Sequence, residues 1–172
     1  MEWKAFSGLR SACRHVRRSL CILPLVVAIA PSLQGASAAP VNVAPTVIVG
    51  NDRGGFIRAR LKELREIRDS GQRVEIRGKV CFSTCTMYLG ADDVCISPKT
   101  TFGFHGPAMA IGRMTQAQFD YTSRVIASHY PPSIAQWYMA EGRTRITGFY
   151  RMKGEQLIRL GIESCPAQIS PR

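Results

Sequence analysis

Ser83 and His105 are the two side chains in this chain whose types and setting suit a nucleophile and its general base. Ser83 follows the apolar residues "VCF" and stands where "TCTMYLGA" predicts the start of a short helix. A helix N-terminus offers free N–H groups and a positive dipole end to a developing oxyanion. His105 ends the predicted strand "TTFGFH" and could take the proton of the serine. The pair is therefore a candidate site for attack on a carbonyl group.

The elements that must position this pair predict an α/β fold. The runs "TVIVG" (46–50) and "RVEIRGKV" (73–80) read as strands on either side of a helix. That helix, which Gly71 ends, carries on one face Phe56, Ile57, Leu61, Leu64 and Ile67. Strand, helix and strand in this order predict a right-handed βαβ unit and a parallel sheet. The turn "NDRGG" then borders the crevice in which such sheets bind ligands, and its glycines allow a close backbone approach.

The remaining chain predicts two short strands at "VCIS" and "TTFGFH", then helices. The helical segments are "TQAQFDYTSRVIASHY", "PPSIAQWYMAEG" and "KGEQLIRLG", and "IESC" reads as a last strand.

Each candidate site residue also has a structural interpretation. A serine at a helix start is most often a cap, a single histidine is usually structural, and a Gly-Gly pair is usually a turn.

The first 38 residues have the composition of a secretory signal peptide. A basic segment precedes a short apolar run, and Ala36-Ser37-Ala38 forms a cleavage-type site. A membrane anchor is the alternative, but the run is interrupted by Pro24 and Pro31 and is shorter than the roughly 20 residues that span a bilayer. Cleavage would leave residues 39–172 as a single domain without stable membrane insertion, exported and in the periplasm. It would also lower the formal net charge from +11 to +7, since five basic residues and one acid are removed.

The basic residues that remain are scattered and often stand beside acids. They form no block with interleaved aromatic residues, so the composition argues against nucleic-acid binding.

Four cysteines remain after the signal peptide, an even set that predicts two disulfides in an oxidising compartment. These are Cys81, Cys85, Cys95 and Cys165. A zinc site made by three of them with His105 is the alternative, although structural zinc sites usually show tighter paired spacings.

The segments "VIVGNDRGGFI", "VEIRGKVCFSTCTMYLGA" and "TTFGFHGP" together resemble the Clp protease proteolytic subunit of the ClpP/crotonase superfamily. They are more similar still to small exported ClpP-like proteins with a Cys-x-Ser-x-Cys sequence at the nucleophile. The resemblance covers about residues 46–107 and returns at "EQLIRLGIESC". It implies a ClpP/crotonase-like parallel sheet of ββα and βαβ units surrounded by helices, and a serine hydrolase, most simply a peptidase. No cofactor or metal is implied, and the partners would be peptide or protein substrates and, since relatives form rings, other copies of the chain.

Matched residue by residue, the resemblance implies Ser83 as nucleophile and His105 as base. It assigns the oxyanion hole to the backbone N–H groups of Gly54 and Thr84. It also favours, among three possible connectivities, the disulfides Cys81–Cys85 and Cys95–Cys165. The Cys81–Cys85 link would hold the turn that presents Ser83.

One part of the family pattern is missing. The family's acid precedes the last helix, where this chain has "RITGFYRMKG", and neither Glu141 nor Glu155 stands in the matching place. Two alternatives are therefore open: an enzyme that works with a Ser–His dyad, and a catalytically inactive envelope protein that binds peptides. An acyl-CoA enzyme of the crotonase type disagrees with export, because its coenzyme is cytoplasmic. A Ser–Lys dyad is a further alternative, drawing on Lys62, Lys79, Lys99 or Lys153, none of which stands out.

Overall fold

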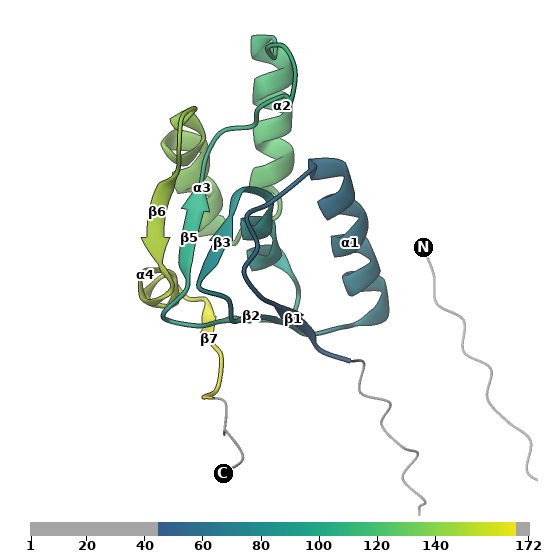
Figure 1. The fold of residues 1–172 in the computed structure, drawn as a ribbon, viewed down its shortest axis with the longest axis vertical. Helices are drawn as coiled ribbons and strands as arrows, with labels where there is room; N and C mark the ends of the chain where they lie inside the picture. Colours follow the sequence, from purple (N-terminus) through teal and green to yellow (C-terminus); the bar gives the residue numbers. More distant parts are fainter. Residues whose placement is uncertain (1–44, 168–172) are drawn as a thin grey trace, which may run out of the picture. The chain divides into compact units, whose positions relative to one another are not determined.

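The computed structural model describes residues 45–167, so the predicted signal peptide lies outside the described residues. Strands and helices alternate along most of this segment (Figure 1). In chain order they are β1 (Val47–Val49), α1 (Ile57–Ser70), β2 (Val74–Ile76), β3 (Val80–Phe82), the 3₁₀ helix η1 (Ser83–Gly90), β4 (Val94–Ile96), β5 (Thr101–Phe104), α2 (Gln116–Ala127), α3 (Pro132–Ala140), the 3₁₀ helix η2 (Gly142–Thr144), β6 (Tyr150–Lys153), α4 (Gly154–Arg159) and β7 (Glu163–Ser164).

The strands form two small sheets that are mostly parallel. The first has the order β1-β2-β4-β7 and is parallel throughout. In the second, β3 pairs in parallel with β5, and β6 pairs antiparallel on the other side of β5. A single parallel bridge between Asp52 and Cys81 joins the loop after β1 to β3. The prediction of an α/β fold with a mostly parallel sheet is thus confirmed.

The segment "RVEIRGKV", predicted as one strand, is divided between the two sheets. Its first part is β2, and β3 begins only at Val80. The division occurs at Gly78, whose N–H donates to the Val49 carbonyl at 3.1 Å. A Cβ at this position would lie 2.1 Å from the Gly50 carbonyl oxygen, so only glycine permits this approach of the two chain segments. The hydrophobic alternation of the segment does not reveal this change of sheet.

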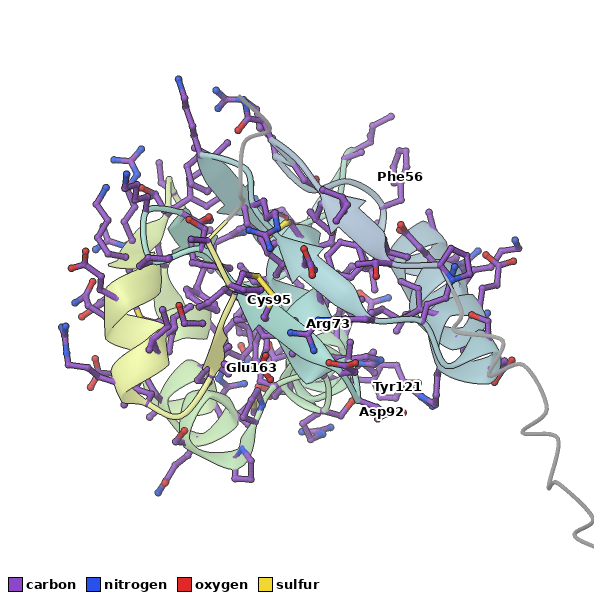
Figure 2. All side chains as sticks on the ribbon, turned by 90° about the horizontal axis from the view of Figure 1, so that it is seen from below. Phe56, Arg73, Asp92, Cys95, Tyr121 and Glu163 are labelled. Atoms are coloured by element: carbon purple, nitrogen blue, oxygen red, sulfur yellow. A yellow bond between two sulfur atoms is a disulfide. The ribbon has the colours of Figure 1, made fainter. Side chains whose placement is uncertain are left out.

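Helix α1 buries the expected apolar face with one exception. Leu64 and Ile67 are buried in the core, whereas Phe56 is 77% exposed and points away from the protein (Figure 2). Phe56 has extended backbone angles and precedes the first helical turn, so it is not on the helical face. The buried position next to Leu64 and Ile67 in α1 is instead occupied by Arg60. A charged residue is almost never buried unless it is paired with other polar or charged groups. The partners of Arg60 lie beside the candidate site.

Two cross-links hold the edge of the first sheet. Cys95 in β4 forms a disulfide with Cys165, which follows β7. Arg73, directly before β2, donates a hydrogen bond to Glu163 at 2.6 Å (Figure 2) and another to Asp93. These contacts join the last strand to β2 and β4, far earlier in the chain.

Among the described helices, none is long and apolar enough to cross a membrane.

The strand β6 was not predicted from the sequence. The segment "RITGFYRMKG" alternates poorly, and three of the four β6 residues are exposed. The strand forms because β5 offers an unpaired edge, with Thr101 opposite Lys153 and Gly103 opposite Arg151. Because Tyr150 pairs with Phe104, the preceding residue Phe149 lies next to His105.

Candidate active site

Ser83 is held in a backbone conformation that serine rarely adopts. Its φ angle is +55°, and among residues 45–167 it is the one non-glycine residue with a positive φ. It follows the last residue of β3 and is the first residue of η1. Ser83 is not the cap of this helix, because Phe82 occupies the N-cap position of η1. A strained residue of this kind persists only where the surrounding structure fixes it, and such residues cluster at functional sites.

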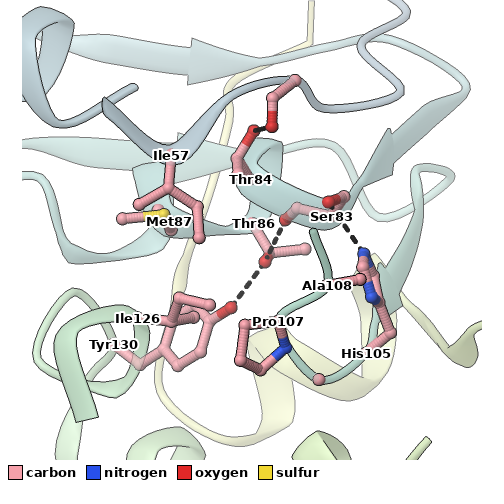
Figure 3. Close-up of a pocket in the computed structure, with 12 residues that line it drawn as sticks. Ile57, Ser83, Thr84, Thr86, Met87, His105, Pro107, Ala108, Ile126 and Tyr130 are labelled. Atoms are coloured by element: carbon pink, nitrogen blue, oxygen red, sulfur yellow. Dashed lines mark hydrogen bonds between the residues drawn. The ribbon is translucent and has the colours of Figure 1, made fainter. Parts of the chain in front are cut away.

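The side chain of Ser83 is hydrogen-bonded to His105. The distance between Ser83 Oγ and His105 Nε2 is 2.8 Å (Figure 3). His105 follows β5, which pairs with β3, so the two strands bring residues 22 positions apart into contact. The geometry meets the requirement for a nucleophile and its base. Two of the lysines that could serve as the base of a Ser–Lys dyad have other partners: Lys62 donates a hydrogen bond to Glu66, and Lys153 donates one to Thr101.

His105 has aromatic rather than acidic surroundings. The ring of Phe149 lies edge-on to the imidazole, with 5.3 Å between ring centroids. Within residues 45–167 no carboxylate is hydrogen-bonded to His105. Burial lowers the pKa of His105 below its usual 6.5, and a backbone hydrogen bond with Gly106 opposes this shift. The imidazole is therefore neutral at pH 7, the state in which Nε2 can accept a proton.

The glycine turn "NDRGG" lies directly against the serine. A Cβ on Gly54 would be 2.5 Å from Ser83 Cβ, so glycine is required for this approach. However, the N–H of Gly54, expected in the oxyanion hole, donates to Asp52 Oδ1 at 2.7 Å. The next residue, Gly55, lines the pocket beside Ser83 together with Thr84. Since the N–H groups of a first helical turn have no partner within the helix, the Thr84 amide suits the expected role.

A polar network that the sequence analysis missed holds this glycine turn. Arg60 donates to Asp52 Oδ2 and, at 2.8 Å, to Glu63 Oε2. The hydroxyl of Tyr88, in η1, donates to Glu63 Oε1. Burial and this hydrogen bond raise the pKa of Tyr88, so the hydroxyl keeps its proton. The network thus connects the loop after β1, helix α1 and the helix that begins at Ser83.

A small pocket opens beside Ser83 and His105. Its volume is about 70 Å³, well below the roughly 300 Å³ of small-molecule sites. Its walls are apolar in part, with Ile57, Met87 and Ile126 on one side and Pro107 on the other, and polar where Ser83 and His105 lie (Figure 3). At its base the Tyr130 hydroxyl is bonded to Thr86 Oγ1 at 2.6 Å. The pocket suits one small apolar side chain rather than a whole small molecule.

The cysteines around the serine form a disulfide. Cys81 and Cys85 are bonded to each other, and both are fully buried. Together with Cys95–Cys165 this is the favoured connectivity, and the prediction of disulfide bonds is confirmed. The zinc alternative is incompatible with these bonds, because a disulfide-bonded cysteine offers no thiolate to a metal. Two disulfides fit a compartment outside the cytoplasm.

Comparisons with known proteins add no assignment. No family model matches the chain, and no curated protein matches it significantly.

Proposed function

We propose that this protein is an exported serine hydrolase of ClpP/crotonase-like fold that acts on peptides in the periplasm. The observation that carries this proposal is the 2.8 Å hydrogen bond between Ser83 Oγ and His105 Nε2, with Ser83 held at a positive φ at the start of a helix. A serine that only capped the helix would need neither feature. The two disulfides and the small pocket, part of whose wall is apolar, agree with an extracytoplasmic enzyme that binds one side chain next to the scissile bond.

The proposed reaction follows from the atoms at the site. Ser83 Oγ attacks the peptide carbonyl carbon while its proton passes to His105 Nε2. The N–H groups of Gly55 and Thr84 stabilise the oxyanion, Gly55 replacing Gly54 because the Gly54 amide already bonds Asp52. Collapse of this intermediate breaks the C–N bond, and His105 returns the proton to the leaving amine. Water then attacks the acyl-serine with His105 as base, which releases the acid and restores Ser83.

The aromatic surroundings of His105 favour slow turnover and support a second candidate function. In a Ser–His–Asp triad the acid stabilises the charged imidazole, and its loss lowers turnover by about 10⁴. In this protein Phe149 lies beside His105. A catalytically inactive, ClpP-like envelope protein that binds peptides would keep the same pocket without needing the acid.

Labelling with a fluorophosphonate tests the proposal. The oxidised protein is expected to form an adduct on Ser83, located by mass spectrometry, because the neutral imidazole activates the hydroxyl. Ser83→Ala should abolish the adduct, and His105→Ala should lower the labelling rate by about 100-fold or more. Ser70→Ala is a matched control, since Ser70 is an exposed serine at the end of α1. Absence of adduct in folded protein would reject the hydrolase in favour of the peptide-binding protein.

The pH dependence of labelling tests the acid-free dyad. Burial lowers the pKa of His105, so the neutral, basic form dominates down to a lower pH than in a free histidine. The labelling rate should rise with pH, reach half its maximum below pH 6.5, and stay constant through pH 7 to 8. A midpoint above 6.5 would contradict the dyad, because it would reveal a carboxylate that stabilises the imidazolium.

A further inference from the structure

A basic groove lies on the exposed face of the second sheet, next to the catalytic pair. Paired residues place six positions on this face, because partners in register share a face and alternate residues return to it. They are Val80 and Phe82 in β3, Thr101 and Gly103 in β5, and Arg151 and Lys153 in β6. The groove over them has a volume of about 520 Å³ and is also lined by Arg53, from the glycine turn.

Three cations line this groove, and two of them lie at one aromatic ring. The Arg53 and Arg151 guanidinium carbons lie 5.9 and 6.0 Å from the centre of the Phe82 ring. Lys153 Nζ donates to Thr101 Oγ1 at 3.0 Å. All three residues are exposed, whereas Phe82 is buried. The ring therefore orients two guanidinium groups whose N–H donors remain available to a ligand.

These cations lack acidic partners within residues 45–167. The ion pairs there use Arg60, Lys62, Arg73, Arg77 and Arg143. A groove with three cations and no acid attracts an anion, and arginine favours the planar geometry of a carboxylate.

The position of the groove relates it to the proposed reaction. Phe82 directly precedes Ser83, and its ring stacks on Phe149 at 4.6 Å, which in turn contacts the His105 ring. His105 lies two residues beyond Gly103, which is one of the six positions on this face. Two residues of strand span about 7 Å. A peptide bound at Ser83 therefore has its neighbouring residues within reach of these cations.

We propose that this groove recognises a carboxylate of the peptide substrate. The inference rests on the proposed hydrolase and defines its substrate class: peptides with a small apolar residue in the pocket and an acidic group on the other side of Ser83. The cations of an edge strand can also serve only to prevent sheet-to-sheet association. That role would not require Arg53, which lies outside the strand, to share the Phe82 ring with Arg151.

Binding of matched peptides to the Ser83→Ala protein tests this proposal without hydrolysis. The probes are rhodamine-labelled Ala-Gly heptapeptides in which one Asp is moved through the sequence, with Asn-containing counterparts. Each is made with a free or an amidated C-terminus, which distinguishes a side-chain carboxylate from a terminal one. Fluorescence anisotropy is expected to show about tenfold tighter binding of the carboxylate-bearing peptide for at least one position.

The variant Arg53→Gln/Arg151→Gln should abolish this preference, and Arg65→Gln/Arg68→Gln should retain it. The control pair removes the same charge from exposed positions of α1, so a general charge effect would change both variants equally. Equal binding of acidic and neutral peptides, or a preference that survives in Arg53→Gln/Arg151→Gln, overturns the proposal. Arginine-dependent binding to phosphatidylglycerol vesicles without any peptide preference overturns it in favour of a membrane surface.

The two proposals fail separately. A preference for Asp in a protein whose Ser83 takes no fluorophosphonate leaves the carboxylate site in place and rejects the hydrolase. Labelled Ser83 without a preference for Asp has the opposite meaning.

Discussion

Replacing Cys95 and Cys165 together by alanine should lower the free energy of unfolding of the oxidised protein by about 4 kcal/mol. The disulfide joins residues 70 positions apart, so it removes much of the freedom of the unfolded chain. It also fixes the segment after β7 to β4, at the edge of the first sheet. Since domains are stable by about 5–15 kcal/mol, the loss is a large share of the total. Denaturant titration of the oxidised wild type and the double variant measures it.

The Cys81–Cys85 disulfide provides a matched control. It closes only four residues, for which the same relation gives about 2 kcal/mol. Its removal by alanine should instead affect reactivity, because the bond spans the turn that holds Ser83 at a positive φ. The Cys95/Cys165 variant should retain fluorophosphonate labelling at temperatures where it is folded. Equal loss of stability in the two variants would contradict the chain-entropy argument, and retained labelling in the Cys81/Cys85 variant would contradict the role of that bond.

The sequence predicted the meeting of Ser83, His105 and the glycine turn because each follows a strand. Residues that follow neighbouring parallel strands lie at one edge, so the order of strands alone brings them close. In the structure Ser83 follows β3, which belongs to the second sheet, and the Asp52–Cys81 bridge restores the expected proximity. The three therefore meet as expected, although residues 73–80 contribute to two strands in two sheets rather than to one strand.

The side chains around this pair could not be predicted in the same way. Phe149 precedes β6, and the pairing of β6 with the edge of β5 brings it beside His105. Arg60 reads as a surface residue of an amphipathic helix, and its burial depends on Asp52 and Glu63 from two different elements. One signal was present: Asp two residues before Gly54 is the pattern of an Asx turn, in which the carboxylate accepts the glycine N–H. It indicates that the Gly54 amide is occupied.

Replacing Gly54 by alanine should lower the labelling rate of Ser83 by about 100-fold, because small displacements of a nucleophile have effects of this size. The new Cβ would lie 2.5 Å from Ser83 Cβ and 2.8 Å from the Phe82 carbonyl oxygen. Gly54 also has a φ of +91°, a conformation that alanine rarely adopts. The serine must therefore move away from His105, or the turn must open. We expect an accompanying loss of about 1–3 kcal/mol of unfolding free energy.

Gly71→Ala separates the contact from the backbone strain. Gly71 ends α1 with a φ of +64°, and a Cβ there would meet nothing within 4 Å. This variant should lose about 1 kcal/mol of stability through its positive φ and label at the wild-type rate. Thermal melts and fluorophosphonate kinetics on both variants give the comparison, with labelling measured well below each melting temperature. Similar labelling of the Gly54 and Gly71 variants would mean that Ser83 does not depend on the glycine turn, and the oxyanion role of the neighbouring Gly55 amide would lose its support.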